Sequence, residues 1–175
     1  MVYFQEYSRD IVSMFHDGKE VYQMNIKNRN KVNVVVAGPR DYNDKGFVFG
    51  YLDELLSMIK AETNKDVQII EGGAKGVDFL AKQYAKTHNL STIQVTADWA
   101  RYGKSAGPRR NARMADLCGC CVVFYSGSAG SKSMITEAVK RGVPTYVVSI
   151  SEEVGIGELF KVDDCKEWER VKKMF

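Results

Sequence analysis

The sequence predicts an α/β fold with a parallel sheet of about five core strands, helices on both faces, and short N- and C-terminal additions. Two observations predict it. Short runs of β-branched residues alternate with segments whose apolar residues recur at helical spacing, and glycine-rich loops follow several of these runs. Strands that alternate with helices form parallel sheets whose two faces are both covered by helices.

The expected strands cover residues 31–37, 67–71, 92–96, 121–125 and 145–149. Four helices are expected between them. In the first, the apolar residues fall on one face, namely Val48, Leu52, Leu55, Leu56 and Ile59. Right-handed crossovers place all loops that follow the strands at one edge of the sheet. The loops that begin at Gly38, Gly72, Asp98 and Ser126 are therefore expected to converge on one ligand site.

The two ends of the chain are expected to be additions to this domain. Residues 1–30 form an N-terminal extension that packs on the domain, with a short helix over 4–16 and an edge strand over 21–26. Residues 31–150 form the ligand-binding domain. Residues 151–175 form a C-terminal helical extension, in which Trp168 and Val171 face inward. A homo-oligomer, dimer or higher, is also expected, and the sequence does not choose its order.

The amino-acid composition limits the kinds of protein to which this chain can belong. A chain of 175 residues with 45% apolar and 27% charged residues suits one globular domain. No apolar run is long enough to span a membrane, and no secretory signal is visible. Three of the four cysteines are crowded at 118–121 and cannot easily pair with one another, so we expect reduced thiols and a cytoplasmic location. The cluster leads into a buried strand, where cysteine acts as a small apolar residue, so we expect no metal site. No cofactor is expected either. A formal charge of +3 permits an anionic partner without demanding one.

The first two loops carry residues suited to an anion. Glycines let a ligand approach the backbone, Arg40 offers a fork of donors to phosphate, and N–H groups at a helix start attract negative charge. Asp78 either holds ribose hydroxyls or stabilises the helix dipole. The expected ligand-binding residues here are Gly38, Pro39, Arg40, Gly72, Gly73, Ala74, Gly76 and Asp78.

The third and fourth loops add aromatic, basic and hydroxyl groups. Trp99 either stacks on a base or packs in the core, and the serines either contact phosphate oxygens or cap a helix. The expected ligand-binding residues here are Asp98, Trp99, Tyr102, Arg110, Asn111, Ser126, Gly127, Ser128, Gly130 and Ser131.

These motifs resemble a known superfamily. The runs 38–41, 72–78 and 98–111, followed by Met114, are similar to the SLOG superfamily and to its YspA/YpsA-related branch. More distantly, they resemble the Lonely guy phosphoribohydrolases and DNA-processing protein A. The resemblance implies a Rossmann-like domain over roughly residues 31–150. It also implies a nucleotide or ADP-ribose-like ligand, held by a sensor or a sequestering protein.

Two other functions stay open. The resemblance to Lonely guy proteins suggests an N-glycosidic hydrolase acting on a nucleoside monophosphate. However, Met134 occupies the position of that family's catalytic glutamate, and methionine has no acid–base chemistry. The candidate catalytic residues that remain are Arg110, Glu137 and Asp78, and none is assigned. The other function is single-stranded nucleic-acid binding, through a basic groove of Arg101, Lys104, Arg109, Arg110 and Arg113.

Overall fold

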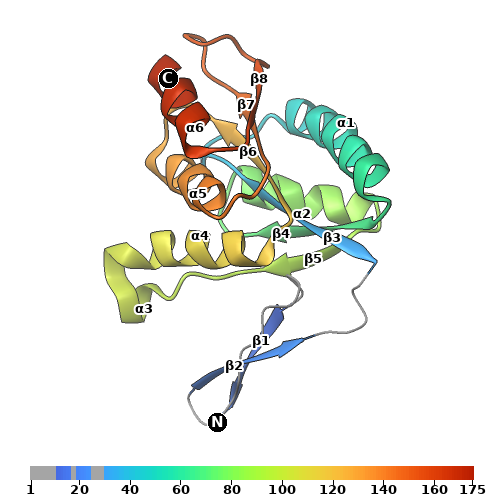
Figure 1. The fold of residues 1–175 in the computed structure, drawn as a ribbon, viewed down its shortest axis with the longest axis vertical. Helices are drawn as coiled ribbons and strands as arrows, with labels where there is room; N and C mark the ends of the chain where they lie inside the picture. The colour runs from blue at the N-terminus through green and yellow to red at the C-terminus, as the bar shows by residue number, and fades with distance from the viewer. Residues whose placement is uncertain (1–10, 17–18, 25–29) are drawn as a thin grey trace.

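The computed structural model describes residues 11–16, 19–24 and 30–175 (Figure 1). They form a six-stranded sheet in the order β5-β4-β3-β6-β7-β8 and a separate two-stranded sheet of β1 and β2. The strands are β1 Ile11–His16, β2 Lys19–Met24, β3 Lys31–Ala37, β4 Asp66–Glu71, β5 Ser91–Gln94, β6 Cys120–Tyr125, β7 Thr145–Ser149 and β8 Leu159–Val162. The helices are α1 Lys45–Thr63, α2 Val77–Thr87, α3 Trp99–Tyr102, α4 Ala106–Leu117, α5 Ala129–Lys140 and α6 Cys165–Val171, with 3₁₀ turns at Gly103–Ser105 and Lys172–Met174.

The predicted α/β fold is confirmed. All five predicted strands are present as β3 to β7, and each pairs in parallel with its neighbours among them. The sheet also has a sixth strand, β8, which pairs antiparallel with β7 inside the segment expected to be only helical. Four residues are too few to show a clear alternation, which is why the sequence pattern did not reveal β8.

Alternate residues of the central strands enter two separate cores. Val34, Ile69 and Val122 face one core, which α1 and α2 cover. Val35 and Ile70 face the other, covered by α4, α5 and α6 (Figure 1). The side-chain period of two along a strand produces this division, and burial on both sides explains why these runs are continuously apolar.

The strand order places the switch in chain direction between β3 and β6. From β3 the chain adds β4 and β5 on one side, and it then returns to place β6 and β7 on the other. Loops that leave neighbouring strands in opposite directions open a crevice at the carboxyl edge of the sheet. The loops after β3 and β6 start at Gly38 and Ser126, so this crevice lies where the sequence placed the ligand site.

The N-terminal prediction needs correction. Residues 11–16 form strand β1 where a helix was expected, and they pair antiparallel with β2, from Ile11 opposite Met24 to His16 opposite Lys19. The expected strand over 21–26 overlaps β2, but β2 is not an edge of the main sheet. The segment 11–16 reads IVSMFH and does not alternate between apolar and polar residues, so its sequence lacks the period of a strand. Residues 4–10 and 25–26 lie outside the described part of the chain.

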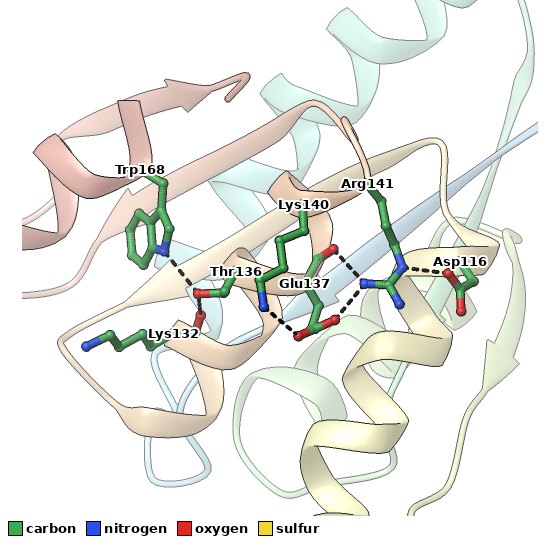
Figure 2. Close-up of polar contacts among 7 residues, drawn as sticks. All are labelled: Asp116, Lys132, Thr136, Glu137, Lys140, Arg141 and Trp168. Carbon is green, nitrogen blue, oxygen red and sulfur yellow. Dashed lines mark hydrogen bonds and ion pairs between the residues drawn. The ribbon is translucent and has the colours of Figure 1, made fainter. Parts of the chain in front are cut away.

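Polar contacts fix α5 between α4 and α6 (Figure 2). The Trp168 indole of α6 donates from Nε1 to Thr136 Oγ1 at 3.0 Å. On the other side, Arg141 pairs with Asp116 of α4 at 2.5 Å and with Glu137 of α5 at 2.6 Å. These contacts hold the helix whose N-terminus reaches the crevice. Among the described residues, no helix is long and apolar enough to cross a membrane.

Gly76 allows the turn before α2 to pass beneath the loop after β3. Its φ is +70°, and a Cβ atom at this position would collide with the backbone carbonyls of Pro39 and Arg40. The same close approach lets the Val77 N–H donate to the Pro39 carbonyl at 3.2 Å. Only glycine combines this φ with this contact.

We expect Gly76→Ala to destabilise the fold more than Gly142→Ala. Both positions have positive φ, which costs a residue with a Cβ about 1–2 kcal/mol. At Gly142 no atom lies within 4 Å of the added Cβ, whereas at Gly76 the backbone must move, at a further cost of ~1–3 kcal/mol. Urea unfolding of the two variants measures the difference, and equal losses would contradict the packing described here.

Candidate functional site

A cleft of about 710 Å³ lies at the carboxyl edge of the sheet. Its walls come from the loops after β3 and β4, from the segment that joins α3 to α4, and from the first turn of α5. The predicted site residues that line it are Gly38, Pro39, Arg40, Ala74, Asp78, Trp99, Arg110, Asn111, Ser128, Gly130 and Ser131. Residues from four separate loops therefore meet in one concave surface of a size that suits a nucleotide.

A smaller cavity of about 540 Å³ lies at the opposite, amino edge of the sheet. It is lined by Lys31 and Ser91 at strand starts and by Tyr84 and His88 at the end of α2. None of the predicted ligand-binding residues lies there. Ligands of parallel α/β sheets bind at the carboxyl edge, so the larger cleft is the candidate site.

A chain of hydrogen bonds joins three walls of the cleft. Asp78 Oδ2 accepts the N–H groups of Gly72 and Ala74 at 3.2 and 3.3 Å. The Gly72 carbonyl accepts from Arg110 at 2.9 Å, and Arg110 also donates to Asn111 Oδ1 at 3.1 Å. Asn111 then donates from Nδ2 to the Gly130 carbonyl at 3.2 Å. We call these contacts the Asp78–Arg110–Asn111 network; it connects α2, α4 and the start of α5.

Burial shapes the charges of this network. Asp78 and Asn111 are each 3% exposed. Burial raises the pKa of the Asp78 carboxyl, against the opposing effect of Arg110. Burial likewise lowers the pKa of the Arg110 guanidinium, against the opposing effect of Asp78. Burial and the opposite charge thus act in opposite directions on both groups, and each charge partly compensates the burial of the other.

The first turn of α5 presents free backbone donors to the cleft. Ser128 is the N-cap residue, but its side chain does not cap the helix and donates to Ser131 Oγ at 2.8 Å instead. The first N–H groups of a helix have no partner within it, and the helix dipole makes that end positive. With Gly130 exposed, this turn forms a place where a phosphate can approach the backbone.

Cations and an exposed indole complete the cleft. The Arg40 guanidinium lies 5.8 Å from the centre of the Trp99 ring, and Trp99 is 51% exposed. Lys104 also lines the cleft and is exposed. Trp99 therefore does not pack in the core, which was the alternative left by the sequence.

Several glycines predicted to bind the ligand instead make room for other groups of the protein. Gly72, Gly73 and Gly76 do not line it. A side chain at Gly72 would meet Arg110 and Asp78, and one at Gly73 would meet Gln94. Their lack of a Cβ makes room for neighbouring groups of this chain, a use that sequence alone does not distinguish from ligand contact.

Four other predicted residues also lie off the cleft walls. Asp98 caps α3 by accepting the Arg101 N–H at 3.0 Å. Tyr102 lies beneath the guanidinium of Arg109, and Gly127 faces the backbone of the C-terminal residue. Ser126 is exposed but absent from the lining.

The candidate catalytic residues divide in the same way. Arg110 and Asp78 line the cleft within the network, whereas Glu137 does not line it. The Glu137 carboxylate is held by Arg141 at 2.6 Å and by Lys140 at 3.6 Å, on the side of α5 toward α4 (Figure 2). Met134, at the position of the Lonely guy glutamate, is 1% exposed and forms part of the cleft wall. Glu137 therefore cannot replace that glutamate in this structure.

The cleft also contains residues that the predicted set lacked. These are Ala37, Asp41, Lys104, Gly107, Pro108, Ala129 and Ser133. Most of them neighbour predicted residues in the same loops, so the motif runs could have identified these lining residues as well. Gly107 has a particular role, because the edge of the Trp99 ring lies 3.3 Å from where its Cβ would be.

The cysteines form no visible site. Cys118, Cys120 and Cys121 are buried free thiols, and Cys165 is exposed. Burial raises the pKa of Cys120 to about 12, so this thiol is not a reactive thiolate. In the described ranges, no three His, Cys, Asp or Glu side chains are grouped so that they could hold a metal ion.

Glu71 is a buried carboxyl at the end of β4, directly behind the network. It is 1% exposed, accepts the Gly73 N–H at 2.5 Å through Oε2, and has no hydrogen-bond partner for Oε1. Burial raises its pKa above the ordinary value of 4.5, and the Gly73 N–H, Lys82 and Arg110 only partly counteract this effect, to which the charge of Asp78 adds. Protonated Glu71 therefore stabilises the fold, and this contribution is lost as the pH rises through the folded-state pKa.

Glu71→Gln should remove this pH dependence. The amide keeps an acceptor for Gly73 and carries no charge, so we expect the variant to gain stability relative to the parent protein between pH 4 and pH 8. Urea unfolding at several pH values measures the gap, with the exposed Glu62→Gln as control. A gap that is constant with pH would show that Glu71 does not titrate in this range.

Comparison with known proteins supports the family and the fold. Residues 32–102 match the family model described as the YspA, cpYpsA-related SLOG family. The fold is similar to the X-ray structure of DNA processing protein A from Streptococcus pneumoniae, with a TM-score of 0.56 and 18% identity. That match covers 81% of this chain and 56% of the other, so this chain spans little more than half of its length. No curated protein sequence matches the chain.

The structural match shows the Rossmann-like fold, and the family match includes the loops after β3 and β4 and Trp99 of the cleft. The resemblance that the motifs predict, to the YspA/YpsA-related branch of the SLOG superfamily, is confirmed over residues 32–102.

Proposed function

We propose that the chain binds a nucleotide or ADP-ribose-like ligand in this cleft, as a sensor or sequestering protein. The observation that carries the proposal is the convergence of the uncapped first turn of α5 with Arg40 and the exposed Trp99 in one cleft at the switch point of the sheet. The match to a SLOG family supports a nucleotide-related function.

The phosphate of the ligand would contact the start of α5. The N–H groups of this turn and the hydroxyls of Ser128 and Ser131 are donors without a competing carboxylate cap. Arg40 comes from the opposite wall and supplies a charged partner. A helix start combined with an arginine is a recurring way to hold phosphate.

The base and ribose would occupy the part of the cleft toward α3. Trp99 offers a half-exposed indole there, and aromatic rings stack on nucleobases. Asp78 uses one carboxylate oxygen for the loop after β4. Its other oxygen is the acceptor that a ribose hydroxyl would use, so both roles considered for Asp78 are compatible.

Binding is favoured over N-glycosidic hydrolysis. The cleft has a methionine where the phosphoribohydrolase activity needs a glutamate, and Glu137 is engaged elsewhere. Asp78, the remaining buried carboxylate in the cleft, is committed to two backbone N–H groups. Asp41, the other carboxylate of the described lining, is exposed to solvent, so neither carboxylate is both buried and unengaged.

Native mass spectrometry with AMP, NAD, ADP-ribose and cyclic ADP-ribose tests the proposal. We expect at least one of them to be retained as an adduct of unchanged mass, and the same spectra report whether the protein is the expected homo-oligomer. Release of free base and sugar phosphate would instead indicate a hydrolase. Binding of none of the four would contradict the proposal.

Arg40→Ala should weaken binding of the retained nucleotide about tenfold, because it removes a charge-assisted hydrogen bond to phosphate. Lys75→Ala is the matched control, since Lys75 is exposed on the neighbouring loop and does not line the cleft. Isothermal titration calorimetry measures both. Equal affinities of the two variants would remove Arg40 from the site.

A further inference from the structure

A second cationic group lies beside the cleft, on the segment that joins α3 to α4. The guanidinium carbons of Arg101 and Arg109 lie 5.1 and 4.6 Å from the centre of the Tyr102 ring. Both arginines are exposed, while Tyr102 is half-buried. We call these three residues the Tyr102 arginine pair. One aromatic ring thus carries two cations.

Among the described residues, these two cations have no carboxylate partner. In the described part of the chain, no ion pair involves Arg101 or Arg109, whereas Arg141 and Arg170 each pair with carboxylates. The nearby carboxylate of Asp98 accepts the backbone N–H of Arg101 and caps α3. Two guanidinium groups against one ring leave a local excess of positive charge, which an anion from outside neutralises.

The chemistry of the pair favours a phosphate over a base. Because both guanidinium groups lie over the Tyr102 ring, the ring orients the cations and is not free for stacking. A guanidinium presents planar donors that match phosphate oxygens and do not lose their charge. Trp99 also has one guanidinium over its ring, that of Arg40 at 5.8 Å, but half of its surface is exposed and available to a base.

The pair is adjacent to the cleft along the chain. Pro108 and Arg110, on either side of Arg109, both line the cleft. Lys104, which also lines it, lies between Arg101 and Arg109 in the sequence and is exposed. The segment 99–110 therefore carries cleft residues and the arginine pair together, so one ligand could contact both.

We propose that the Tyr102 arginine pair is a subsite for a second phosphate of the ligand. This inference rests on the proposed function, and it narrows the ligand to a nucleotide with more than one phosphate. Two ligand types share this chemistry: a nucleoside with a pyrophosphate, and a nucleotide joined to another by a phosphodiester.

The test compares AMP, ADP and the 5′-phosphorylated dinucleotide pApA by calorimetry on the full chain. We expect ADP, pApA or both to bind about tenfold more tightly than AMP, as one added charge-assisted contact allows. The double variant Arg101→Gln, Arg109→Gln should lose this gain and keep the affinity for AMP. A gain with ADP marks a pyrophosphate, and a gain with pApA alone marks a phosphodiester. The gain should also fall as salt is added. A plot of log affinity against log salt concentration should be steeper by about 0.7 for the ligand with the second phosphate than for AMP.

The control is Lys65→Gln with Lys86→Gln, which removes the same net charge at exposed positions near the amino edge of the sheet. If this control lowers the gain as much as the arginine variant does, the effect is one of net charge and the subsite is wrong. Equal affinities for AMP, ADP and pApA would overturn the subsite and leave the proposed function standing. If all three fail to bind while ADP-ribose or NAD binds to the cleft, the double arginine variant should weaken that ligand about tenfold, and an unchanged affinity would overturn the subsite. Failure of every nucleotide would overturn both proposals.

Discussion

The geometry of the cleft depends on the Asp78–Arg110–Asn111 network. Arg110 is the central member, because it donates to the Gly72 carbonyl at the start of the loop after β4 and also orients Asn111, which in turn holds the first turn of α5. Elements that are far apart in the sequence thereby keep a fixed separation. The network neutralises its own buried charges, so the exposed cations at the rim, Arg40 and Lys104, remain for an anionic ligand. A carboxylate and an arginine that look catalytic in the sequence thus have a structural task.

Much of the fold was predictable because a parallel sheet that is covered on both faces requires continuous apolar runs in its strands. β3, β6 and β7 are continuous apolar runs since both of their faces are buried, and α1 and α2 show one apolar face each. β8 and β1 were not predictable, because strands of four to six residues at the margin of a domain lack a distinctive period.

The site was predictable at the level of loops and less so at the level of residues. Parallel topology alone brings the four loops together, and eleven of the predicted ligand-binding residues line the cleft. The exceptions follow one physical rule. Gly72 and Gly76 cannot carry a side chain, because Arg110 and the Pro39 backbone occupy the space where their Cβ atoms would be. Sequence shows that space is needed at such positions, but not whether a ligand or the protein fills it.

The most direct test of the central claim is a ¹⁵N-labelled NMR titration with the nucleotide retained in native mass spectra. We expect the largest amide shift changes at Ala129, Gly130 and Ser131, together with a change of the Trp99 indole N–H, because these groups surround the proposed phosphate and base positions. Changes confined to the amino edge of the sheet, around Lys31, His88 and Ser91, would contradict it, because they would place the ligand in the smaller cavity.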